Sequence, residues 1–88
     1  MHAVVFQVDF VPGREAQQDA ELDFLTSMMK EVPGFVRGTW SGDGTRGLSY
    51  LVFDSEEAAR AVAGSAQMPP DAAAVLRSVD VYEVARDI

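Results

Sequence analysis

The chain contains no cysteine and a single histidine, His2, and these absences exclude several kinds of site. Without cysteine there are no disulfides and no thiolate metal sites. A metal site needs three or four convergent ligands, and the remaining carboxylates show no spacing typical of a metal-binding loop. We therefore expect no metal site. His2 lies at the terminus and is interpreted as an exposed, inert residue rather than a catalytic base.

Basic residues are also scarce, with 7 Lys and Arg against 14 Asp and Glu, for a net charge of −7. An acidic surface repels phosphate backbones and anionic lipid headgroups, so nucleic acid and membrane are not expected as partners. No apolar run approaches the ~18–20 residues of a membrane span. The first ten residues, MHAVVFQVDF, lack the basic region and cleavage site of a signal peptide. We expect a cytoplasmic protein.

The 88 residues are enough for one domain, taken as 1–88, and 48% of them are apolar, which permits a real core. Alternating and helical patterns occur twice in the order strand, helix, strand. The predicted strands are Ala3–Phe10, Phe35–Ser41, Leu48–Phe53 and Arg77–Arg86. The predicted helices are Arg14–Glu31 and one capped by Asp54 or Ser55 and stopping near Gly64, with a short helical turn at Ala72–Leu76 capped by Asp71.

Two such units fold most simply as a ferredoxin-like βαββαβ domain of the α+β class. The sheet is expected to be antiparallel with four strands in the order 4-1-3-2 and with both helices on one face. Pro33-Gly34 ends the first helix abruptly, because proline disfavours helical geometry in Val32 and glycine permits a sharp turn. This turn sends the second strand to the far edge and leaves a slot that the third strand fills. Ser41–Gly47 is a glycine-rich hairpin loop rather than a phosphate-binding motif.

The second face of this sheet is half apolar, because the strand Leu48–Phe53 carries apolar side chains on both faces. An open apolar sheet face of several hundred Å² usually marks an interface. We therefore expect a homodimer in which two sheets pack face to face into a dimeric α/β barrel.

Four residues are candidates for a catalytic or binding role. Asp80 and Tyr82 lie two apart on one strand face, and a carboxylate–phenol pair facing a cavity could serve acid–base chemistry. A surface or dimer-contact role is the commoner one for such a pair. Tyr50 could grip a planar ring together with Tyr82 if both face the same side of the sheet. Trp40 is the other candidate, although an aromatic of this kind is more often a packing anchor.

Four segments carry a resemblance to a known family: VDFVPGRE, EVPGFVRGTW, SYLVFDSEEAARA and SVDVYEV. Over about residues 3–86 the chain resembles the dimeric α/β-barrel superfamily, and within it the antibiotic biosynthesis monooxygenase-like group. In that family a hydrophobic ligand lies between sheet and helices or inside the barrel. Some members oxidise polycyclic aromatic substrates without metal or flavin, because the substrate's own carbanion reacts with oxygen. Other members degrade haem.

The haem-degrading members use an Asn on strand one, a Trp at the end of strand three and a His on the second helix. Here strand one has no Asn, strand three ends in Phe53, and no His follows His2. The resemblance therefore implies no haem and no other cofactor. Two functions stay open. One is a cofactor-independent monooxygenase-like oxidoreductase acting on a small hydrophobic or aromatic metabolite. The alternative is a non-catalytic dimeric module that binds a small ligand.

Overall fold

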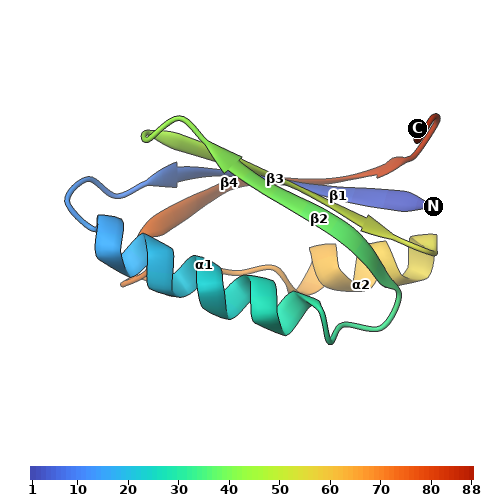
Figure 1. The fold of residues 1–88 in the computed structure, drawn as a ribbon, viewed down its shortest axis with the longest axis horizontal. Coiled ribbons are helices and arrows are strands. Elements are labelled where there is room, and N and C mark those ends of the chain that lie inside the picture. Colours follow the sequence, from blue (N-terminus) through green and yellow to red (C-terminus); the bar gives the residue numbers. More distant parts are fainter.

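The computed structural model describes residues 1–88 and contains one antiparallel sheet with two helices. The strands are β1 (His2–Phe10), β2 (Phe35–Gly42), β3 (Arg46–Phe53) and β4 (Ala74–Glu83), in the order β2-β3-β1-β4. Helices α1 (Glu15–Met29) and α2 (Glu56–Ser65) both lie on one face of the sheet (Figure 1). The predicted ferredoxin-like βαββαβ fold and the order 4-1-3-2 are confirmed, since this is the same order counted from the other edge.

The turn between α1 and β2 works as the sequence predicts. Gly34 has φ +84°, a left-handed conformation that L residues with a side chain rarely adopt. Its carbonyl accepts a hydrogen bond from the Asp54 amide at 2.9 Å. A Cβ at Gly34 would lie 2.8 Å from Cβ of Ala58. Gly34 therefore both turns the chain and lets the start of α2 pack against the turn.

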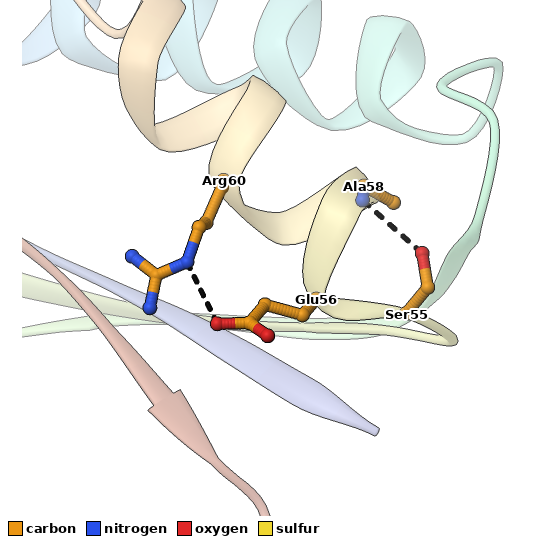
Figure 2. A network of polar contacts seen from close by, with 4 residues as sticks. All are labelled: Ser55, Glu56, Ala58 and Arg60. Atoms are coloured by element: carbon orange, nitrogen blue, oxygen red, sulfur yellow. Dashed lines mark hydrogen bonds and ion pairs between the residues drawn. The ribbon is translucent and has the colours of Figure 1, made fainter.

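Helix α2 begins at a side-chain cap. The Ser55 hydroxyl accepts a hydrogen bond from the Ala58 amide at 3.1 Å, so Ser55 is the cap among the two predicted candidates (Figure 2). The predicted stop near Gly64 agrees with the structure to within one residue. The helix continues through Gly64 to Ser65 and ends because Ala66 takes an extended conformation, with φ −67° and ψ 123°.

The short helical turn predicted at Ala72–Leu76 is wrong, and β4 begins within it at Ala74. Strand β1 continues to Phe10 and pairs there with Ala74, so sheet pairing outweighs the helix propensity of the alanines. The Asp71 side chain caps no helix. Its backbone carbonyl instead accepts hydrogen bonds from Gln17 at 2.8 Å and Arg14 at 3.2 Å, which tie the connector before β4 to α1.

The hydrophobic core is small and lies mainly between α2 and the central strands. Only 11 of the 88 residues are buried, and none of them is polar or charged. The central cluster consists of Val4, Met29, Leu51, Phe53 and Ala59. Helix α1 contributes only Met29 to it. The other apolar side chains of α1 are therefore not part of this core cluster.

The face of the sheet opposite the helices is partly covered by the C-terminal segment. Ala3 and Val52 point to this face, yet both are completely buried. Arg37 on edge strand β2 forms an ion pair with Asp87, which follows β4 at the other edge. The segment after Glu83 must therefore cross this face, and Figure 1 shows the C-terminus on the side away from the helices. Neither helix is long and apolar enough to span a bilayer.

Candidate functional site: a pocket between helix α1 and the sheet

A partly enclosed apolar pocket of about 570 Å³ lies between α1 and the helix-facing side of the sheet. Its volume falls within the ~300–1,000 Å³ of small-molecule sites. Alternate side chains of the strands form one wall, successive turns of α1 form the second, and the segment after α2 closes one end. The main apolar lining residues are Phe6, Val8, Phe10, Trp40, Leu51 and Leu76 from the strands, Leu22, Leu25, Met28 and Met29 from α1, and Met68 from the connector.

Trp40 is the residue of the predicted set that lines this pocket. It pairs with Ser49 across the β2–β3 ladder, and its side chain points toward the helices. A Cβ at Gly38 would lie 3.0 Å from two atoms of the indole ring and 2.7 Å from Leu51. The indole therefore lies along β2 over Gly38. Any larger residue at position 38 would clash with the ring. This places a flat aromatic surface on the pocket wall.

The polar groups of the lining are few, and its only charged residues are Asp19 and Glu21 of α1. The Glu21 carboxylate accepts hydrogen bonds from the Ala73 amide at 3.0 and 3.2 Å and from the Gln17 side chain at 2.9 Å. These hydrogen bonds of Glu21 link α1 to the connector before β4 at the end of the pocket. Asp19 forms no ion pair.

The other three candidates lie on the opposite face of the sheet. Tyr50 and Asp80 both pair with Val5, one from each side of β1, and Tyr82 pairs with Ala3 in the neighbouring row. Tyr50 is half-buried, Asp80 is exposed and Tyr82 is 56% exposed. Tyr50, Tyr82 and Asp80 thus share one face, and Trp40 is separated from them by the sheet.

The remaining polar features belong to turns and helix ends. Backbone amides of Arg46 and Thr45 donate to Asp43 in the β2–β3 turn and lower the pKa of its carboxyl. A hydrogen bond from Arg60 (Figure 2) and the charge of Arg60 lower the pKa of Glu56 at the start of α2. The charge of His2 lowers it to a smaller extent. His2 is half-buried in β1, with Nδ1 buried and unpartnered, so the expectation of an exposed terminal residue is wrong. No group of three or more His, Asp or Glu is placed to hold a metal ion.

The family resemblance implied a ligand between sheet and helices, but the residue patterns by themselves did not predict this pocket or its lining. The spacing of Leu22, Leu25 and Met28 predicts an apolar helix face but does not say whether that face meets a filled core or a cavity. The available signal was Gly38 two residues before Trp40, because a glycine and a tryptophan on one strand face give the indole room to lie flat.

Comparison with solved structures shows the same fold along the whole chain. A structure of the heme-degrader MhuD from Mycobacterium tuberculosis, with two hemes bound in its active site, matches with a TM-score of 0.74 at 16% identity, covering 100% of this chain and 99% of that one. A mutant MhuD with two manganese protoporphyrin IX per active site gives 0.73 at 18% identity, covering 100% and 98%. Heme-free, cleaved protein from M. tuberculosis gives 0.66 at 23% identity, covering 100% and 96%. The chain therefore has the same fold as these MhuD structures. No family model and no curated protein matches its sequence.

The residues that line the pocket of this chain do not fit haem. No histidine lines the pocket to ligate iron, and no Lys or Arg lines it to pair with the two carboxylates of a haem. The likeness to MhuD at 16–23% identity therefore describes the fold, and the ligand must be argued from the residues of this chain.

Proposed function

We propose that the pocket between α1 and the sheet binds a small hydrophobic or aromatic metabolite, and that the chain oxidises this ligand as a cofactor-independent monooxygenase-like protein. The observation that carries the proposal is an apolar pocket of about 570 Å³ with the Trp40 indole on its wall. A pocket of this kind removes the apolar surface of a ligand from water at ~25 cal/mol per Å². The indole adds a face on which a planar ring can stack.

The chemistry requires a substrate that supplies its own electrons. An acidic CH₂ next to the aromatic rings loses a proton and the resulting carbanion reduces O₂. The CH₂ becomes a carbonyl that keeps one oxygen atom, and the other oxygen leaves as water with the two hydrogens of the CH₂. The protein's part is to bind and orient the substrate and to limit the access of water. Since no tyrosine or histidine lines the pocket, the proton passes to water or to one of the two carboxylates of α1, Asp19 and Glu21.

A non-catalytic small-ligand-binding module is the second candidate, and a specific observation favours it. The pocket contains no side chain that is typical of a general base poised near neutral pH, and the chain has no buried charged residue at all. A protein that only holds its ligand has no need of such groups.

In both cases we propose a homodimer formed through the sheet face opposite the helices. Leu48 and Val75 point to this face and are 43% and 46% exposed, beside half-buried Val5 and Tyr50. In that dimer Tyr50, Tyr82 and Asp80 would lie at the subunit interface. Their role as a second aromatic-binding site stays a prediction that depends on the dimer.

Binding can be tested with acridine, a neutral tricyclic aromatic that accepts tryptophan emission. Trp40 is the only tryptophan of the chain, so its quenching reports contact at the pocket. We expect saturable quenching that Ser49→Phe, a substitution in the pocket wall, weakens at least tenfold. Ser27→Phe is the matched control, because Ser27 lies exposed on α1 outside the pocket lining. Equal affinity of both variants would contradict the proposed site.

Turnover separates the two candidate functions. Anthrone, a tricyclic ketone with an acidic CH₂, gives anthraquinone and water with one O₂. We expect the protein to accelerate quinone formation and oxygen uptake in the presence of a metal chelator, and Ser49→Phe to lose this acceleration. Saturable acridine binding without any acceleration across a panel of such ketones would identify the chain as a binding module.

A further inference from the structure

The charged residues in the lining of the pocket all have one sign. Of the 24 residues that line it, only Asp19 and Glu21 are charged, and both are acidic. The seven basic residues of the chain lie elsewhere. Arg37, Arg60 and Arg77 form ion pairs with carboxylates outside the lining. Arg14 donates to the backbone carbonyls of residues 71 and 72.

We infer that the ligand of this pocket is a cationic aromatic compound, such as a ring system bearing a basic nitrogen, and not an aromatic acid. The inference rests on the proposed binding function and names the chemical class of its ligand. An anionic group in the pocket would meet two carboxylates and no compensating cation. A positive group would meet the same carboxylates with favourable Coulomb energy.

Asp19 is the residue expected to contribute most to this preference. Its side chain is exposed at the pocket, so the carboxylate is solvated and available to a ligand. Glu21 adds a second negative charge one half-turn further along α1, but its oxygens already accept hydrogen bonds from Ala73 and Gln17. The ring would stack on Trp40 and the charged nitrogen would lie toward α1.

This preference separates the chain from the structures that share its fold. The MhuD structures bind heme or manganese protoporphyrin IX, and protoporphyrins carry two carboxylates. The same fold with an acidic, lysine-free and arginine-free pocket selects the opposite ligand charge. Specificity of this kind comes from unpaired like charges as much as from attractive contacts.

The test uses three tricyclic probes of similar size and different charge: 9-aminoacridinium, neutral acridine and acridine-9-carboxylate. Each is titrated against Trp40 fluorescence at pH 7.5 and 0.15 M salt. We expect the affinity to fall in the order cation, neutral, anion. Asp19→Asn should narrow the ratio of cation to anion affinity by roughly three- to tenfold, which corresponds to one charge about 6 Å away in a partly solvated site.

Asp23→Asn is the matched control, because it removes the same charge from the same helix at a residue outside the pocket lining. At this salt concentration charges beyond ~8 Å are largely screened, so we expect Asp23→Asn to change the ratio less than twofold. Equal affinity for cation and anion, tighter binding of the anion, or equal effects of both substitutions would overturn the charge inference while leaving the pocket proposal intact. Absence of binding by all three probes would instead refute the proposed binding function.

Discussion

At the scale of single residues, the pocket depends on a few side chains whose neighbours determine their position. The Trp40 indole lies over Gly38, and the Phe10 ring lies in the same way over Gly42 and Gly47 at the hairpin end of the sheet. In both places glycine removes the Cβ that would lift a ring away from the strand. The aromatic wall of the pocket is therefore encoded by glycines as much as by the aromatic residues themselves.

Asp43 gives a prediction about pH. Its Oδ1 accepts hydrogen bonds from the amides of Thr45 at 2.9 Å and Arg46 at 2.7 Å, and these lower the pKa of the carboxyl in the folded state. A lowered folded-state pKa contributes stability above the ordinary aspartate pKa of about 3.9, and this contribution is lost as the pH falls through the folded-state value. We expect the urea midpoint of the wild type to fall in this acidic range more steeply than that of Asp43→Asn.

Asp43→Asn is informative because the amide keeps an acceptor for both backbone donors but cannot titrate. Asp23→Asn is the control variant, because Asp23 is an exposed carboxylate that accepts no backbone hydrogen bond from the turn. Asp87→Asn would not serve as a control, because it breaks the ion pair with Arg37. If wild type and Asp43→Asn lost stability in parallel between pH 5 and 3, the turn carboxylate would have no such role.

At the scale of elements, the junction between α1, β2 and α2 is the point where one residue controls three elements. Gly34→Ala would force a side chain into a left-handed backbone position, at a cost of roughly 1–2 kcal/mol. Its Cβ would also lie 2.8 Å from both Ala58 Cβ and Asp54 Oδ1. We expect the free energy of unfolding to fall by about 2–4 kcal/mol in urea denaturation followed by Trp40 fluorescence.

Gly64→Ala is the control for this prediction. Gly64 lies in α2 with no heavy atom within 4 Å of an added Cβ and without a positive φ. Alanine favours a helix over glycine by at most ~1 kcal/mol, so this variant should be as stable as the wild type or slightly more stable. A Gly34→Ala variant that matched Gly64→Ala in stability would refute the role assigned to the turn.

The elements also show what the sequence could and could not predict. The strands and helices and their order along the chain could be predicted from the periodicity of apolar residues and from Pro33-Gly34. Both signals are local properties of the sequence. The prediction of a helical turn at Ala72–Leu76 is wrong because Ala74 pairs with Phe10 in the sheet. That pairing depends on how far β1 extends, which the local sequence around Ala74 does not show. The pocket could not be predicted from the residue pattern for a related reason. The helical spacing of apolar residues in α1 does not determine the distance between the helix and the sheet.

At the scale of the whole molecule, the sequence left open whether Tyr50 and Tyr82 lie on the same face of the sheet or on opposite faces. The register places both on the face away from the helices. The sequence did not indicate the crossing of this face by the C-terminal segment. The Arg37–Asp87 pair joins one edge strand to the segment that follows the other edge strand, 50 positions later in the chain. The crossing buries Ala3 and Val52. Leu48 and Val75, toward the β2–β3 hairpin, and Tyr82, in the row of Ala3, stay exposed on this face.

The last prediction concerns this remaining surface. This face carries Leu48, Val75 and Tyr82, each more than 40% exposed, next to half-buried Val5 and Tyr50, and exposed apolar side chains on one sheet face are typical of an interface. We expect light scattering at micromolar concentration to return about twice the chain mass. Leu48→Asp should return the mass of one chain, because it replaces an exposed apolar side chain of the proposed contact with a charge that the contact would bury. Tyr50→Phe and Tyr82→Phe should leave the dimer intact, since they keep the ring and remove only the hydroxyl.

Phe24→Asp is the matched control for the dimer, because Phe24 is 67% exposed on α1 and lies on the other side of the molecule, outside the pocket lining. It should retain the dimer mass. A wild-type mass near 9.5 kDa would refute the face-to-face dimer outright, and dissociation by Phe24→Asp instead of Leu48→Asp would move the interface to the helices. A dimer that persists in Tyr50→Phe and Tyr82→Phe while acridine binding is unchanged would assign the ligand to the Trp40 pocket alone and leave the two tyrosines with a packing role at the interface.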